Sequence, residues 1–291
     1  MNLIATVLAT VLLGATTAHA ATGWYIAFGI GASKADTMKQ AGNNDDTTCY
    51  PDDDCSHLPD MLPSGYRWFY DLHPGTDAAF ELAVGYGFRL FRLELATTRQ
   101  TLGIDQQFVG GSYLDGSRAM PAADSFYTVD VKTGVDDLTL HTLALNAYAD
   151  LPIANPRLAP YLGLGLGLTF AKLSRLHYES AYALKELECP DAAACAYPEG
   201  YEEIQDIDPA MYNGRQHIDL TDTVPSVHFH LGADYRIGDT LLIGLKVSYN
   251  LAGDMSQEDA YEYHAIEGMT SHTEISGIRY WTFLLNLKWE L

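Results

Sequence analysis

The feature that most constrains the fold of this chain is a strict alternation of apolar residues with small or polar ones. The clearest segment places Leu162, Leu164, Leu166, Leu168 and Phe170 opposite Gly163, Gly165, Gly167, Thr169 and Ala171. Successive side chains of a β-strand point to opposite faces, so a period of two predicts a strand with one apolar face, which a helix does not produce. Such a strand belongs to a sheet with an apolar side and a polar side.

Seven further segments of the chain alternate in the same way. They cover residues 23–33, 78–88, 91–96, 141–151, 227–237, 241–251 and 281–291. Most provide about ten residues, the length that a tilted strand needs to cross the hydrocarbon core of a bilayer. Leu138 and Leu140 are out of phase with the segment that follows them, so we expect a β-bulge near His141.

The connections between these segments alternate in length. Those after the second, fourth and sixth segments are short, at residues 89–90, 152–157 and 238–240, and the other four are long. Short turns at one end and long loops at the other are typical of membrane barrels with short periplasmic turns and long extracellular loops. The sequence therefore predicts an all-β fold, an eight-stranded antiparallel up-and-down transmembrane β-barrel with both termini at the short-turn end.

The two faces of the predicted strands decide between a membrane barrel and a soluble one. One face carries Leu, Phe, Trp and Tyr, with Trp24, Tyr86, Tyr235, Tyr249 and Trp289 as candidates for interfacial aromatic belts. The other face mixes Gly and Ala with charges of both signs, which can pair inside a narrow lumen. A soluble lipocalin-like ligand-binding barrel is the alternative, with the apolar face turned inward.

In the membrane reading, the polar face forms a network inside the barrel. Its predicted members are Glu81, Arg92, Glu94, His228, His230, Asp234, Arg236, Lys246 and Lys288. His228 and His230 lie on one face with Asp234, which also suits a metal, but two ligands without an identified third favour hydrogen-bonding residues. Such a network closes the lumen, and a wide aqueous pore needs about 16 strands. A narrow channel remains an alternative.

The N-terminus and the composition indicate export and exclude one class of partner. An apolar run over residues 3–13 precedes the small-residue site Ala18-His19-Ala20, so we expect residues 1–20 to be a signal peptide and residues 21–291 the barrel domain. The compartment is then oxidising, and the local pairs Cys49 with Cys55 and Cys189 with Cys195 predict two disulfides. A net charge of −21 argues against binding nucleic acid.

Most of the acidic residues lie in the four predicted long loops, 35–76, 101–138, 173–223 and 253–276. Clusters such as Asp52 to Asp54 offer oxygen ligands for Ca²⁺ or Mg²⁺, but the sequence favours a solvated anionic surface. The loops also carry many Tyr residues, a residue type enriched at binding surfaces. We expect no metal or cofactor, and a structural and interaction role in which the loops contact a host or cell-surface partner.

The chain resembles the small eight-stranded outer-membrane β-barrels of Gram-negative bacteria, the group of opacity-like proteins and OmpA-type barrel domains. The resemblance lies in GWYIAFGIGAS at 23–33, LNAYADL at 145–151, PYLGLGLGL at 160–168, ADYRIGDTLLIGLKVSYNL at 233–251 and the terminal FLLNLKWEL. It implies localisation in the outer membrane, contact with its lipid and lipopolysaccharide, and delivery by the barrel-insertion machinery. The family's terminal strand is the insertion signal and commonly ends in Phe. The matching residues are Phe283, Leu285, Leu287, Trp289 and Leu291, so the terminal aromatic is replaced.

Some small membrane barrels modify lipid A, so an enzyme of this kind is the alternative function. A catalytic serine needs a nearby histidine and an acidic or amide group that orients it. No His-x-Ser occurs, and the nearest cluster is Ser271-His272 with Glu274. Neighbouring residues of a strand point to opposite faces. The sequence therefore predicts that the protein is not an enzyme.

Overall fold

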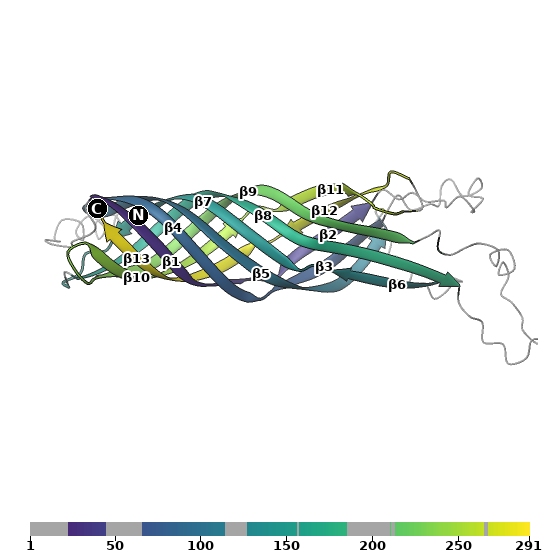
Figure 1. Cartoon of the computed structure of the whole chain (residues 1–291), viewed down its shortest axis with the longest axis horizontal. Helices are drawn as coiled ribbons and strands as arrows, with labels where there is room; N and C mark the ends of the chain where they lie inside the picture. The colour runs from purple at the N-terminus through teal and green to yellow at the C-terminus, as the bar shows by residue number, and fades with distance from the viewer. Residues whose placement is uncertain are drawn as a thin grey trace, which may run out of the picture.

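The computed structural model describes residues 23–44, 66–113, 127–155, 157–184, 210, 213–264 and 267–291, and nearly all of them belong to strands of one long tube (Figure 1). The strands are β1 (Gly23–Ala35), β2 (Met38–Asn44), β3 (Tyr66–Pro74), β4 (Thr76–Phe88), β5 (Phe91–Tyr113), β6 (Tyr127–Gly134), β7 (Asp137–Asp150), β8 (Leu158–Leu184), β9 (Gly214–Arg236), β10 (Leu241–Ala252), β11 (Met255–Ala260), β12 (Thr270–Ser276) and β13 (Arg279–Glu290). Among these residues, no helix is long and apolar enough to cross a membrane.

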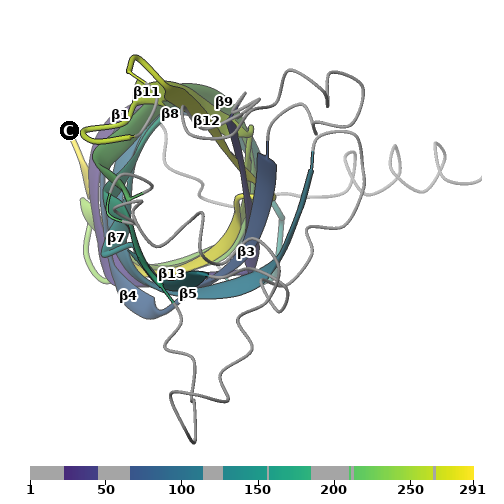
Figure 2. The same ribbon diagram turned by 90° about the vertical axis from the view of Figure 1, so that its right-hand side faces the viewer.

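Eight of the strands close a ring, which Figure 2 shows along its axis. The antiparallel order is β1, β4, β5, β7, β8, β9, β10 and β13, and β13 pairs with β1 from Tyr25 opposite Glu290 to Ala35 opposite Tyr280. In this ring each described strand pairs with a neighbour on both sides, which leaves no open strand edge, as a structure in lipid requires. The predicted eight-stranded antiparallel barrel is confirmed by this pairing.

The other five strands extend the ring at one end. Short breaks at 36–37, 75, 135–136, 253–254 and 277–278 separate β1 from β2, β3 from β4, β6 from β7, β10 from β11 and β12 from β13. At the last break, Gly277 adopts a φ of +74°, a conformation that glycine reaches without strain. β5, β8 and β9 run past this level without a break. The 27 residues of β8 would span about 90 Å fully extended, far more than a bilayer core of about 30 Å.

The two ends of the barrel differ as the sequence predicts. Arg89 and Leu90 connect β4 to β5, residues 151–157 connect β7 to β8, and residues 237–240 connect β9 to β10. The described chain starts and finishes at this same end (Figure 1). At the other end, however, β2, β3, β6, β11, β12 and the ends of β5, β8 and β9 occupy much of the predicted loops 35–76, 101–138, 173–223 and 253–276. The barrel is longer, and its loops shorter, than the sequence prediction.

The predicted bulge near His141 is wrong. β7 pairs with β5 and with β8 without any shift in register. Leu138 and Leu140 point inward together with Thr142, and all three are buried. Their apolar character has another cause, because the barrel interior changes from polar to apolar at this level.

The exterior of the ring is apolar over about the height of one bilayer. On β8, the exposed side chains run from Leu162 to Phe170, and the next outward residue is Lys172. On β13, Trp281 to Trp289 repeat this pattern. At the level of these apolar side chains, charged residues such as Arg92, Asp234 and Lys288 point inward and are buried, so the faces are the inverse of those in a soluble lipocalin-like barrel, and that alternative is excluded for this fold. We call this exterior band the apolar belt.

Beyond the apolar belt, the wall is no longer fully paired. At this level β11, β12, β2, β3 and β5 pair in series, and so do β6, β8 and β9. Between β9 and β11, side chains replace the ladder: the Thr221 N–H donates to Gln257 Oε1 at 2.8 Å, and the Ser256 N–H donates to Asp222 Oδ2 at 3.1 Å. Between β5 and β6, the described residues form no ladder.

Candidate functional site

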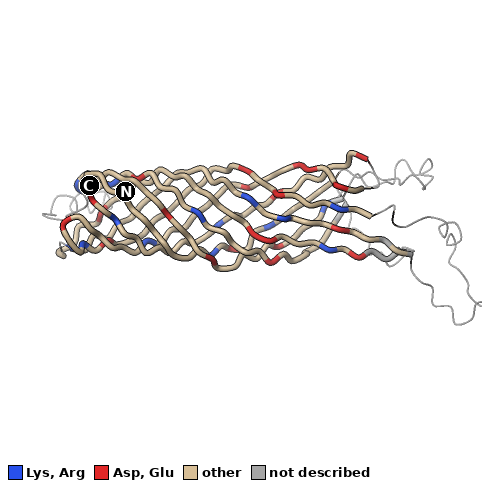
Figure 3. The backbone as a smooth tube through the Cα atoms, viewed as in Figure 1, with Lys and Arg blue, Asp and Glu red and all other residues tan. Residues whose placement is uncertain are grey.

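The lumen of the ring holds a buried ionic network near the short-turn end. Its charged residues are Arg92, Lys246 and Lys288 with Glu81, Glu94, Asp150 and Asp234, and all are buried. They come from β4, β5, β7, β9, β10 and β13, because the inward positions of these strands meet at one level. Figure 3 shows that charged residues occur along the whole tube, including the half that carries the apolar belt.

The network has two centres. Asp234 Oδ2 accepts from Arg92 Nη1 and from Lys288 Nζ, each at 2.7 Å, while Arg92 Nη2 lies 2.7 Å from Asp150 Oδ1. In the second centre, Lys246 Nζ donates to Glu81 Oε1 and lies 3.8 Å from Glu94 Oε1. A buried charge is costly unless it is paired, so these contacts make a polar lumen compatible with a stable barrel.

Three tyrosines connect the two centres. Tyr25 and Tyr148 donate to the two oxygens of Glu94 at 3.0 and 2.8 Å. The Tyr161 ring lies under both Arg92 and Lys288, whose cationic groups are 4.5 and 4.8 Å from its centroid. A Cβ on Gly85 would lie 2.2 Å from the Tyr25 ring, and one on Gly232 would lie 2.4 Å from the Tyr161 ring. The glycines of the inner face therefore make room for the rings.

A layer of neutral polar side chains lies above the network. Ser226 Oγ and His228 Nε2 are 3.0 Å apart, and His228 Nδ1 is 2.7 Å from Asn250 Oδ1. His230 bridges Ser248 and Asn146 in the same manner, at 2.8 and 3.2 Å. Both histidines are thus hydrogen-bonding residues of the lumen, and both line a small cavity. No group of three metal-ligating side chains occurs among the described residues.

The order Ser226, His228, Asn250 is that of a nucleophile, a base and an orienting group. Sequence reasoning missed it, although the Ser-x-His spacing places both side chains on one strand face. Ser226 is only 3% exposed and lies between the ionic network and the apolar layer described next. Ser271 and His272 point to opposite sides of the wall, since Ser271 is buried and donates to Gln216 whereas His272 is exposed.

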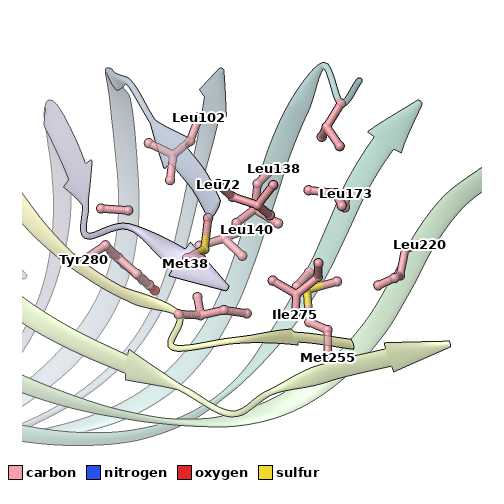
Figure 4. Packing of buried hydrophobic residues seen from close by; sticks show 14 of the residues in the cluster. Met38, Leu72, Leu102, Leu138, Leu140, Leu173, Leu220, Met255, Ile275 and Tyr280 are labelled. Carbon is pink, nitrogen blue, oxygen red and sulfur yellow. The ribbon is translucent and has the colours of Figure 1, made fainter. Parts of the chain in front are cut away.

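An apolar plug fills the lumen at the level of the strand breaks. Figure 4 shows its side chains gathered in one layer inside the wall. Its fully buried members are Met38, Leu72, Leu102, Leu138, Leu140, Leu173, Leu220, Met255, Ile275 and Ile278. They come from eight of the strands and from the break at 277–278, and they turn inward where the exterior turns polar. The plug and the ionic network are therefore two successive barriers along the lumen.

Above the plug, the interior is polar and aromatic again. Gln106 Nε2 donates to Gln40 Oε1 at 2.7 Å, and Gln216 donates to the carbonyl oxygens of Asp259 and Ala260. Burial raises the pKa of Tyr178, which lines the same space. On the outside at this level, Asp219 accepts from Lys172 and from the Arg175 N–H, which hold the pKa of its carboxyl below the usual range.

The structure brings together eight of the nine residues predicted for the interior network. Arg236 is the exception, because it lies at the short-turn end, half-buried, in a two-bond pair with Glu290 at 2.6 and 2.8 Å. Asp150, Tyr25, Tyr148 and Tyr161 were missed. Alternation already placed Asp150 and Tyr148 on the inner face, so the face assignment itself was the signal for them.

Other predicted residues lie elsewhere. Phe283, Leu285, Leu287, Trp289 and Leu291 are exposed on the lipid-facing side, and their role as an insertion signal stays a prediction. The Trp24 ring packs edge-on against the Tyr86 ring, with 5.3 Å between their centroids. The centroids of Tyr249 and Trp281 are 4.8 Å apart, and the two pairs lie at opposite borders of the apolar belt. Several predictions fall on residues outside those that the structure describes: the predicted signal peptide, the acidic cluster Asp52 to Asp54, and the cysteines Cys49, Cys55, Cys189 and Cys195.

No family model matches the chain, and no curated protein does. Among solved structures, it is similar to Neisserial surface protein A, with 11% identity over 94% of this chain and 100% of that one and a TM-score of 0.42. It is similar to the outer membrane protein OprG of Pseudomonas aeruginosa, with 12% identity, 94% and 98% coverage and a TM-score of 0.49. It is also similar to the outer membrane protease OmpT of Escherichia coli, with 8% identity over 95% of this chain and 99% of that one and a TM-score of 0.37.

Proposed function

We propose that this protein is an outer-membrane surface protein that does not conduct solutes and whose extracellular end interacts with other molecules. The observation that carries this proposal is the combination of a lumen closed at two levels with a barrel wall that continues beyond the apolar belt. A closed lumen opposes transport, and a projecting wall presents side chains to the exterior.

The apolar belt and the polar interior support a location in a bacterial outer membrane, where closed antiparallel barrels with short turns at one end occur. The lipid partners are then outer-membrane lipid and lipopolysaccharide, and the barrel-insertion machinery recognises the terminal strand. The projecting part carries the four loops, whose acidic residues and tyrosines suit contact with a host or cell-surface partner. The proposal includes the two predicted disulfides, each of which would close a short segment within one of those loops.

Conductance tests the closed lumen directly. We expect the purified protein to insert into planar bilayers without single-channel steps. A variant with Met38, Leu72 and Ile275 changed to Ala should also stay silent, because the ionic network remains. Regular steps from the unmodified protein would contradict the proposal and favour a narrow channel.

Attachment tests the interaction role. Cells that display the protein should bind host cells or extracellular matrix more strongly than cells that display a variant whose four loops are replaced by short turns. Equal binding by both cells would contradict the role of the loops. Labelled lipopolysaccharide incubated with the purified protein gives the enzymatic control, and we expect no release or transfer of acyl groups, because Ser226 is enclosed.

A further inference from the structure

Among the residues that the structure describes, the wall beyond the apolar belt has two strand edges with no paired strand, one on β5 and one on β6. β5 pairs with β7 as far as Gly103 opposite Asp137, and the Ile104 N–H donates to the Asp136 carbonyl at 3.0 Å. From Asp105 to Tyr113, β5 pairs only with β3. β6 pairs only with β8 over its whole length. We call the two free edges, Asp105–Tyr113 and Tyr127–Gly134, the β5–β6 notch.

The position of the notch follows from the break in the wall. At residues 135–136 the chain leaves β6 and enters β7, so that β7 stays beside β5 while β6 continues the sheet of β8 (Figure 1). Farther along, β5 also carries an irregularity, since Tyr70 lies opposite Phe108 and Phe69 lies opposite Gly110. Val109 is the additional residue of this β-bulge. Free strand edges present unpaired N–H and C=O groups, which readily pair with another extended chain.

Exposed apolar side chains provide a second, independent observation. Outside the apolar belt and the short-turn end, the described chain exposes four large apolar side chains. Three of them are Phe108, Val109 and Val131, with 57%, 60% and 47% of their surface accessible, and all three lie on the notch. The fourth, Tyr263, lies at the far end of the barrel next to β9. Three of the four exposed apolar side chains thus gather on the two edges, and such a concentration is typical of a surface that a partner covers.

The polar groups of the notch indicate what kind of partner fits. Gln106 Oε1 is buried at the inner side of the β5 edge, without a hydrogen-bond donor. The exposed charges of the two edges are Asp105, Asp130 and Lys132, and Lys132 lies 3.8 Å from Asp130. With a chain of net charge −21 around it, this surface favours a cationic partner.

We propose that the β5–β6 notch docks an extended, cationic segment of another protein, which adds as a strand to β5 and covers Phe108, Val109 and Val131 with alternate apolar side chains. Main-chain hydrogen bonds then supply affinity, and the apolar contacts fix the register, as in other cases of strand addition. This inference goes beyond the proposed function, because it places a docking edge on the barrel wall rather than in the loops.

A peptide of eight residues that alternates Val and Lys, labelled with fluorescein, is the probe. Its binding to the protein in phosphatidylcholine nanodiscs is followed by fluorescence anisotropy, with empty nanodiscs as the blank. We expect saturable binding to one site. The same peptide with every peptide nitrogen methylated keeps its charge and apolar side chains but loses its backbone donors, and we expect it not to bind.

Variants of the edges locate the site. Phe108→Lys and Val131→Lys place a repelling charge on the free edges, as natural edge strands do, and should weaken binding by about tenfold or more. Tyr263→Lys adds the same charge to an exposed aromatic at the same end of the barrel and should change binding by less than about twofold. All variants should keep the heat-dependent gel mobility of the folded barrel.

Each opposite result overturns the proposal. Absence of peptide binding to the unmodified protein would remove the docking edge. Equal binding of the methylated peptide would show that the notch takes up apolar or charged molecules without strand addition. If Tyr263→Lys weakened peptide binding as much as Phe108→Lys and Val131→Lys do, net charge alone would explain the effect of all three variants. Since purified protein is used, any of these results can occur while attachment of whole cells through the loops persists.

Discussion

At the scale of single residues, Lys246 is the cation on which the second centre of the network depends. It is buried between Glu81 and Glu94, so its removal leaves two buried carboxylates without their cation. We expect Lys246→Met to lower the free energy of unfolding by about 3–5 kcal/mol, measured by urea denaturation in lipid vesicles. The double variant with Glu81→Gln should recover part of this loss. A single variant as stable as the unmodified protein would show that the lumen is hydrated enough to solvate both carboxylates.

Asp219 gives a prediction about pH. Lys172 and the Arg175 N–H stabilise its charged form and lower its pKa in the folded protein. A lowered pKa means that this stabilisation is present above the pKa of the unfolded chain and is lost as the pH falls through the pKa of the folded state. Carboxyl ¹³C NMR should therefore find Asp219 titrating below a free aspartate. Lys172→Met should raise the midpoint, and Lys132→Met, farther along the wall, should leave it unchanged.

At the scale of elements, β7 shows which features the alternation of residues predicts and which depend on packing inside the barrel. Alternation alone correctly assigned the faces from Thr142 to Asp150, because lipid outside and polar groups inside give opposite signals at successive positions. Leu138 and Leu140 break the alternation, and from the sequence alone this break predicts a bulge. A sequence pattern shows which residues share a face, but it does not show that the interior changes to an apolar plug at one height. That change depends on residues from strands far apart in the chain, such as Met38 and Ile275.

The corrected position of Leu140 is testable. It is 1% exposed and packs in the plug, whereas Leu143, three residues later on β7, is exposed on the apolar belt. Leu140→Ala should destabilise the barrel by about 2–5 kcal/mol through the cavity that it leaves. Leu143→Ala should cost clearly less, because lipid fills the space. Equal losses of unfolding free energy for the two variants in vesicles would contradict the position of Leu140 in the plug.

The alternation of residues also does not show where the strands end. The predicted loops begin where the apolar belt ends, at residues such as Lys172, because the exterior pattern disappears there. β8 nevertheless continues to Leu184, since pairing with β9 does not need an apolar exterior. Arg236 was placed in the network by its face alone, and its height at the barrel end was not visible in the pattern. Partners across the lumen, such as Arg92 with Asp234, were found as members of a set but not as pairs.

At the scale of the whole molecule, the height of the apolar belt fixes how the barrel sits in a bilayer. In a background with the four native cysteines changed to Ser, we expect Lys172→Cys to react in intact cells with a maleimide that does not cross membranes. Leu166→Cys, at the middle of the belt, should not react until the membrane is dissolved. Reaction of both positions, or of neither, would contradict the assignment of β8 beyond Phe170 to the exterior.

The ionic network also determines the order in which the barrel can assemble. Arg92 belongs to β5, Asp234 to β9 and Lys288 to the last strand, so their shared contact requires β13 to have reached its place beside β1. Until then, each of these charges would face the membrane interior unless water accompanied it. A half-built wall is therefore not a state in which the chain can rest within lipid. Insertion into the bilayer and closure of the ring should therefore occur as one cooperative event, which is completed when β13 pairs with β1.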